Sequence, residues 1–177
     1  MKALKNKRLF IYQSLAALCA LLTFIFTFIA AYFEADKADL SLAQMAFGVE
    51  DRLPTNAVLV LGWILIIIGM LLSIALCVLL LLKEERKIEV LLTVGGIVSG
   101  LAILAGGIIL ACSIFVTGLN EVNSSLGFTQ GNWGIRAGNI LVPLFALISF
   151  ILSYPSAMVI LHRKDQEDAA RRKALAQ

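Results

Sequence analysis

Four long apolar stretches, separated by short polar segments, dominate the chain. They cover approximately residues 9–33, 57–82, 88–118 and 139–162. A transmembrane helix needs roughly 20 consecutive, mostly apolar residues, and each stretch reaches that length. The pattern therefore predicts an all-α fold, in which residues 1–177 form a single transmembrane domain of a polytopic integral membrane protein.

The polar segments between the stretches predict how the helices are arranged. The turn KEERKIE, between the second and third stretches, is so short that these two helices must be antiparallel neighbours. The other two connections, residues 34–56 and 119–138, are longer and lie together on the opposite side of the membrane. We therefore expect an antiparallel four-helix transmembrane bundle.

Lysine and arginine are distributed unevenly among the polar segments. Twelve of the 15 lie in the N-terminal tail, the KEERKIE turn and the C-terminal tail, and only three lie in the two longer loops. Segments rich in Lys and Arg remain on the cytoplasmic side of a membrane. This distribution predicts a multi-pass protein of the cell membrane, with a cytoplasmic N-terminus, a cytoplasmic C-terminus and two outer loops.

Composition and charge exclude several classes of protein. Hydrophobic residues make up 60% of the chain and charged residues 15%, whereas soluble domains average about 45–50% and about 25%. The net charge is only +3 and topology accounts for the bases, so no nucleic acid is expected as a partner. None of the four apolar cores contains Asp, Glu, Lys, Arg or His, which argues against a proton relay, an ion-coupled carrier or a voltage sensor.

Residues that could support catalysis or bind a metal are sparse. No zinc-protease, esterase or nucleotide-loop motif occurs, and the three cysteines fall inside the apolar stretches, where we expect them to act as small apolar side chains. The acidic residues of the first outer loop, the pairs Asp36/Asp39 and Glu50/Asp51, lack the spacing of an EF-hand. The sequence predicts no enzyme, no cofactor and no metal site.

The third apolar stretch carries a stripe of small residues at helical spacing. The stripe consists of Gly96, Gly100, Gly107 and Ala111, and a second stripe beside it contains Gly95, Ser99, Ala102 and Gly106. In lipid, small residues allow helix backbones to approach closely. We expect the first stripe to be a helix-packing face within this chain. The alternatives are a homo-oligomer joined through the stripe, and a bound lipid or a pathway.

The first outer loop is more apolar than a simple connection. Leu40, Leu42, Met45 and Phe47 lie between acidic flanks, and burying each would recover roughly 1.5–3 kcal/mol. These side chains must cover the outer end of the bundle, enter the membrane interface or meet another protein, in a short helix or a strand. We predict that Leu42, Met45 and Phe47, with Trp133 of the second loop, form a partner-binding surface.

The C-terminal tail continues the fourth stretch with charged residues. The pairs Glu167/Arg171 and Asp168/Arg172 have the acid-before-base order that stabilises a helix, so we expect the tail to extend helix four into the cytoplasm. Its bases and those of the N-terminal tail should attract anionic headgroups of membrane lipids. The alternative to lipid binding by the tail is the docking of a cytoplasmic protein. Within the fourth helix itself, Pro143 and Pro155 should cause bends.

The chain shows two resemblances, one in its helix layout and one in two loop segments. Four helices with a longer first outer loop resemble the tetraspan layout of claudins, although this loop lacks the Trp, Gly-Leu-Trp and paired-cysteine signature of that family. The segments LSLAQMAFG and TQGNWGIRAG resemble small four-helix membrane proteins of Gram-positive bacteria. Both resemblances imply a four-helix membrane fold, and neither supplies a site residue.

Together these patterns favour a non-enzymatic accessory or interaction subunit in a bacterial plasma membrane, whose outer loops recognise a protein partner. The alternative is a small channel or transporter formed by oligomerisation. The apolar cores favour the first hypothesis, because an ion path through lipid commonly uses ionisable side chains.

Overall fold

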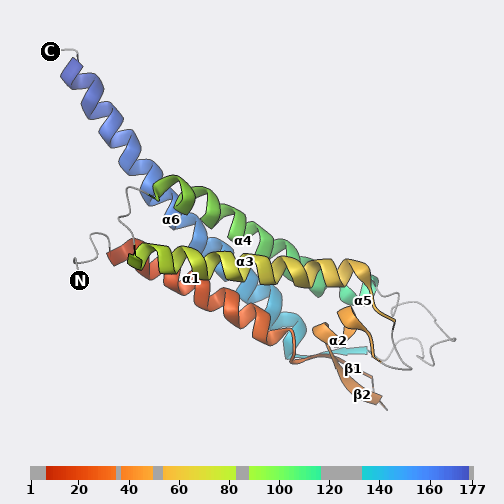
Figure 1. Cartoon of the computed structure of the whole chain (residues 1–177). Coiled ribbons are helices and arrows are strands. Elements are labelled where there is room, and N and C mark those ends of the chain that lie inside the picture. Colours follow the sequence, from red (N-terminus) through yellow and green to blue (C-terminus); the bar gives the residue numbers. More distant parts are fainter. Residues whose placement is uncertain (1–6, 35–36, 50–53, 83–87, 117–132, 176–177) are drawn as a thin grey trace.

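Four long helices form an antiparallel bundle (Figure 1). The structure, a computed structural model, describes residues 7–34, 37–49, 54–82, 88–116 and 133–175. The long helices are α1 (Lys7–Phe26), α3 (Ala57–Leu82), α4 (Glu89–Ala111) and α6 (Ala137–Leu175). Each packs on two neighbours, in the cyclic order α1, α3, α4, α6, so α1 and α4 lie at opposite corners. All four are long and apolar enough to cross a membrane.

A small sheet and two short helices lie at one end of this bundle. Strands β1 (Ala30–Glu34), β2 (Lys37–Ser41) and β3 (Trp133–Ile135) form an antiparallel sheet in the order β2-β1-β3. Helix α2 (Leu42–Phe47) follows β2 directly, and α5 (Ser113–Val116) follows α4. The chain is mostly helical, as predicted, and the sheet is an addition to the expected all-α fold.

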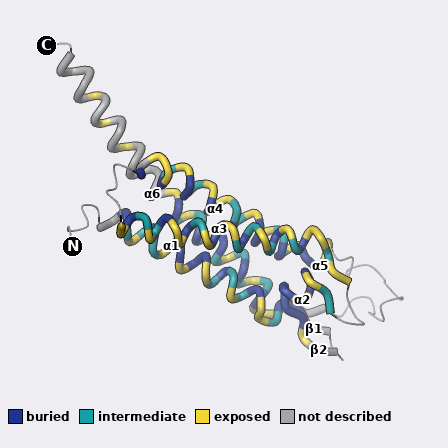
Figure 2. The backbone as a smooth tube through the Cα atoms, viewed as in Figure 1, coloured by how far each residue is buried: buried dark blue, intermediate teal, exposed yellow. Residues whose placement is uncertain are grey.

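Many large apolar residues lie on the outside of the bundle. Buried residues follow the sides on which the helices meet, and exposed residues follow their outer sides (Figure 2). Large aliphatic residues of all four helices are among the exposed ones. Soluble proteins rarely expose continuous apolar surfaces of this extent. The exposed residues include Ile11, Leu18, Leu61, Ile68, Leu71, Val94, Leu101, Ile140 and Ile151.

The first helix is shorter than its apolar stretch, which corrects the predicted range of 9–33. Helix α1 ends at Phe26. The next three amides, those of Thr27, Phe28 and Ile29, each donate a hydrogen bond to the carbonyl oxygen three residues earlier, which forms a tight turn. The chain then becomes extended, because β1 pairs on both sides with β2 and β3. The connection that follows α1 therefore begins at residue 27, seven residues earlier than expected.

The third and fourth helices also differ from their predicted ranges. The predicted helix 88–118 is interrupted at Cys112, which separates α4 from α5. Its last two predicted residues, 117–118, and residues 119–132 of the predicted second outer loop lie outside the described residues. Helix α6 is longer than 139–162. It runs without interruption through Pro143 and Pro155 to Leu175, so the charged tail extends the fourth helix beyond the rest of the bundle (Figure 1).

Candidate functional site

The sheet and α2 form one folded unit over the end of α1. This unit, which we call the cap, comprises residues 27–34, 37–49 and 133–135. Its helix begins with a capping box, in which Ser41 Oγ accepts a hydrogen bond from the Gln44 amide and Gln44 Oε1 accepts one from the Ser41 amide. Gly48 ends α2 with a φ of 86°, a conformation that glycine adopts without strain. The local sequence therefore determines where α2 starts and stops.

Leu42 and Met45 are fully buried beneath the cap. With Tyr32, Leu40 and Ala46 they form one apolar core with residues of three long helices, namely Leu59 and Ile66 of α3, Leu110 of α4 and Val142 of α6. This burial corrects the partner-binding role predicted for Leu42 and Met45, because neither side chain reaches the surface. They cover the bundle end instead, which was one of the three expected outcomes for this loop.

Backbone hydrogen bonds attach the cap to its surroundings at several points. The Asn56 amide, just before α3, donates to the Ala46 carbonyl oxygen at 3.0 Å, and the Arg136 amide, just before α6, donates to the Ala31 carbonyl oxygen at 2.7 Å. The Tyr32 hydroxyl donates to the carbonyl oxygen of Ala111, the last residue of α4, at 3.3 Å. The cap is therefore bonded to the residues just before α3 and α6 and to the end of α4.

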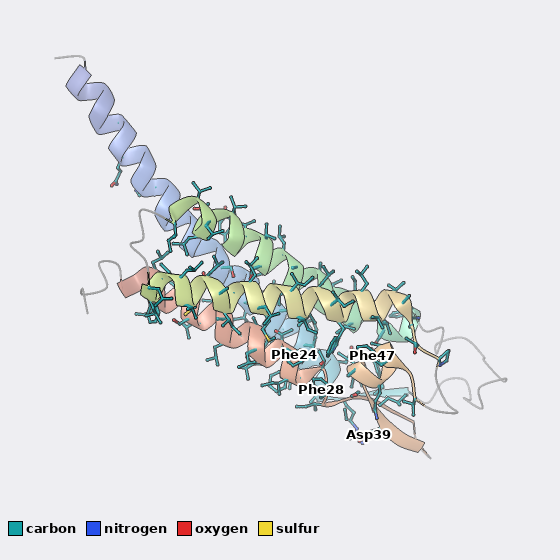
Figure 3. All side chains as sticks on the ribbon, viewed as in Figure 1. Phe24, Phe28, Asp39 and Phe47 are labelled. Atoms are coloured by element: carbon teal, nitrogen blue, oxygen red, sulfur yellow. The ribbon has the colours of Figure 1, made fainter. Side chains whose placement is uncertain are left out.

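Phe47 lies on the surface of the cap, in a cluster of aromatic rings with Phe24, Phe28 and Trp63 (Figure 3). Its ring meets that of Trp63 edge to face, with centroids 4.9 Å apart. Trp63 Nε1 donates to Thr27 Oγ1 at 3.3 Å, which fixes the indole between α1 and α3. Phe47 remains 46% exposed and Phe28 55% exposed, so both rings are available for contact with something outside this chain.

Trp133, the fourth predicted partner-binding residue, begins β3. Its backbone pairs with that of Glu34 in the sheet. Nearby, Arg136 Nη2 and Asp39 Oδ1 form a salt bridge of 3.5 Å that joins the residue after β3 to β2, with both side chains 49% exposed. Of the four predicted partner-binding residues, Leu42 and Met45 are therefore buried and Phe47 is exposed, while Trp133 is placed in the sheet by its backbone.

Helix α4 packs through small residues on two of its faces. Toward α3, a Cβ atom on Gly106 would overlap the carbonyl oxygen of Gly62, and Ser99 Oγ donates to the Gly69 carbonyl oxygen at 2.8 Å. Hydrogen bonds of this kind add to the close backbone contact that holds helices together in lipid.

The predicted stripe of α4 faces α6. A Cβ on Gly107 would lie 2.7 Å from the Cβ of Ala146, and one on Gly100 would lie 3.2 Å from the Cβ of Ser153. A Cβ on Gly96 would make only an ordinary contact, 3.6 Å from the Ser153 carbonyl oxygen. These three glycines therefore pack within the chain, while Ala111 bonds the cap through its carbonyl oxygen.

Polar side chains inside the bundle, which the sequence analysis did not single out, connect α1 to its neighbours. Gln13 Nε2 donates to the Ser73 carbonyl oxygen at 3.2 Å, and both residues are buried. Ser149 Oγ of α6 donates to the Ala16 carbonyl oxygen at 3.0 Å. The one signal available in the sequence was the polar pair Gln13-Ser14 within an apolar stretch.

The arrangement offers surfaces for binding. Within the described part of the chain, no three His, Cys, Asp or Glu side chains gather as metal ligands would.

No protein-family model, curated protein or solved structure matches the chain. The resemblances based on LSLAQMAFG and on the tetraspan layout therefore remain predictions.

Proposed function

We propose that this chain is a non-enzymatic integral membrane protein that acts as an accessory or interaction subunit, with the cap as its outer recognition surface. The observation that carries the proposal is the joining of β3 to β1, because it makes one folded unit from the connections before α3 and before α6. The buried side chains of Leu42 and Met45 fix that unit to the bundle. A rigid surface loses little conformational freedom on binding, which favours recognition.

The membrane-spanning helices support anchoring over transport. The four candidate spans contain no Asp, Glu, Lys, Arg or His. The small-residue faces of α4 are used within the chain, against α3 and α6. Polar groups such as Gln13 and Ser149 bond to neighbouring helices. A bundle of this kind suits a compact anchor for the cap.

The orientation belongs to the same proposal. The beginning of α1 and the far end of α6 lie at one end of the bundle, opposite the cap (Figure 1). We place both termini in the cytoplasm and the cap on the outer side of a bacterial cell membrane. This orientation agrees with the sequence, because 12 of the 15 Lys and Arg residues lie in the two tails and the KEERKIE turn. The same bases would attract anionic headgroups to the cytoplasmic face.

Site-specific photocrosslinking in intact cells tests the recognition surface. A photoreactive amino acid replaces Ile135 in the cap or Ile140 on α6, two isoleucines with similar exposure, 61% and 59%. We expect one discrete protein adduct from position 135 and lipid adducts from position 140, identified by mass spectrometry. An adduct whose mass is that of a second copy of this chain would indicate a homo-oligomer.

Two results would contradict the proposal. One is the same set of protein adducts from both positions, which would mean that the cap is not selective. The other is ion or solute flux through vesicles that contain only the purified protein, which would favour the alternative of a small channel or transporter. Vesicles without protein are the control for the flux measurement.

A further inference from the structure

The cap occupies the corner of the bundle that α1 leaves empty. Trp63 marks the level at which α1 ends, since its ring meets Phe24 and its Nε1 bonds Thr27. Helix α3 continues past this level by the six residues 57–62, about 9 Å at 1.5 Å per residue. Leu59, within that extension, shares the apolar core of Leu42 and Met45. The cap therefore lies beside the end of α3, rather than above it (Figure 1).

The length of α1 sets the depth of the cap in a membrane. The apolar part of α1 begins at Leu9, and a hydrocarbon layer of about 30 Å needs about 20 helical residues. Counting from Leu9, that length ends near Phe28, in the turn that leads into β1. The aromatic cluster of Phe24, Phe28, Phe47 and Trp63 is then level with the boundary between acyl chains and headgroups, where aromatic rings are enriched.

The exposed rings continue an apolar surface that faces outward on the helices. Ile25 of α1 and Val58 and Leu61 of α3 are exposed, and Phe28 and Phe47 contact the rings between these two helices. Charge lies elsewhere on the cap: in Figure 3, Asp39 is on the opposite side of the cap from Phe24 and Phe47. The cap thus has an aromatic side next to the helices and a charged side away from them.

We propose that the aromatic side of the cap, formed by Phe28 and Phe47 against Trp63 of α3, is immersed in the leaflet on that side of the membrane. Its partner is membrane lipid, at the junction of acyl chain and headgroup, while the Asp39–Arg136 pair lies in water. This inference rests on the proposed membrane-spanning role. It assigns Phe47 to lipid, and leaves the charged side and β3 for recognition of a protein.

Accessibility of spin labels measures this depth directly. Cys19, Cys77 and Cys112 are replaced by alanine, and a single nitroxide is attached at Phe47→Cys, Asp39→Cys or Leu71→Cys in phosphatidylcholine–phosphatidylglycerol vesicles. Collisions with oxygen report lipid, and collisions with a water-soluble nickel chelate report water. We expect the ratio of oxygen collisions to nickel collisions to be highest at position 71 and several-fold lower at position 39. The ratio at position 47 should be clearly closer to that at position 71 than to that at position 39.

The three positions separate failure of this inference from failure of the membrane role. Nickel access at 47 equal to that at 39, with 71 in lipid, would overturn the immersion of the cap alone. Nickel access at 71 would overturn the membrane role itself. Protection of position 47 from both reagents would mean that protein covers it, which also contradicts the inference. A second label at Phe28→Cys must agree with position 47, so the result does not depend on one variant folding.

Discussion

Gly62 of α3 and Gly106 of α4 lie backbone to backbone, so close that a Cβ on residue 106 would overlap the carbonyl oxygen of residue 62. Ile66 lies against the same position of α4, with its Cγ1 atom 2.8 Å from where that Cβ would be. Because backbone atoms cannot move aside as a flexible side chain can, these two glycines fix the distance between the helices.

Gly106→Ala should therefore destabilise the protein. Overpacking of a tight contact costs about 1–3 kcal/mol, which outweighs the gain of about 1 kcal/mol in helix propensity. Gly96→Ala is the matched control on the same helix, because its Cβ would make only an ordinary contact. Thermal unfolding in detergent should give a lower Tm for the first variant and an unchanged or higher Tm for the second; equal values would refute the packing argument.

Gln13 and Ser73 should show measurable coupling across the α1–α3 contact. The amide of Gln13 donates to both the carbonyl and the hydroxyl oxygen of Ser73, at 3.2 and 3.4 Å. Interhelical hydrogen bonds in membrane proteins contribute about 0.6 kcal/mol on average in double-mutant cycles. We expect a coupling of about this size between Gln13→Leu and Ser73→Ala, measured by titration with a denaturing detergent. Strictly additive effects would mean that the side-chain bond adds nothing.

Met45→Ala should lower the free energy of unfolding much more than Phe47→Ala. Met45 is fully buried in the core that joins the cap to α3, so its truncation should cost about 2–5 kcal/mol. Phe47 is half-exposed, and the loss of its edge-to-face contact with Trp63 should cost about 0.5–1.5 kcal/mol. The comparison is made by thermal unfolding, and a reversed order would mean that the cap is not anchored through Met45.

The Asp39–Arg136 pair should contribute little to stability. Both side chains are half-exposed, and surface ion pairs contribute about 0–1 kcal/mol. In a double-mutant cycle of Asp39→Asn and Arg136→Gln, we expect a small coupling that disappears in about 1 M salt, where the screening length is about 3 Å. A large coupling that persists in salt would show that the pair is more shielded than its exposure indicates.

Orientation can be measured with one introduced cysteine and one fusion. In the cysteine-free protein, Ala35→Cys should react with an impermeant maleimide added to intact cells, because the proposed orientation puts the connection between the first two long helices outside the cell. A reporter fused after Gln177 should be active only in the cytoplasm. Residues 35 and 177 both lie outside the described residues, so the measurement tests topology alone. Labelling of residue 35 only after lysis would reverse the proposed orientation.

Hydropathy predicted the long helices well and their ends unevenly. The range expected for the second helix, 57–82, is that of α3, because its apolar run ends sharply at Lys83. The end of α1 could not be predicted in this way. Residues 27–33 are as apolar as the helix before them, and pairing with strands formed by residues 37–41 and 133–135 makes part of this segment extended. Such pairing is set by distant parts of the chain, which composition does not reveal.

The cap illustrates a similar limit for the candidate site. The sequence indicated that Leu42, Met45 and Phe47 would leave water, but it could not tell which of them faces the bundle. That depends on how far α3 extends past α1, since the extension supplies Leu59 to the core beneath the cap. The polar contact between Gln13 and Ser73 was missed for the same reason, because it joins residues 60 positions apart.

The position of α6 has a consequence for biosynthesis. This helix supplies Ala146 against Gly107 and Ser149 against the Ala16 carbonyl oxygen, and β3 immediately before it completes the sheet. A ribosome makes these residues after all the other long helices, so the nascent chain passes through a stage with three helices and an unpaired edge on β1. A chain truncated before residue 133 would lack β3 and α6 and would remain at that stage. The face of α4 that contains Gly100 and Gly107 would then be exposed to lipid. Such a product should be a substrate for the proteases that remove incomplete membrane proteins.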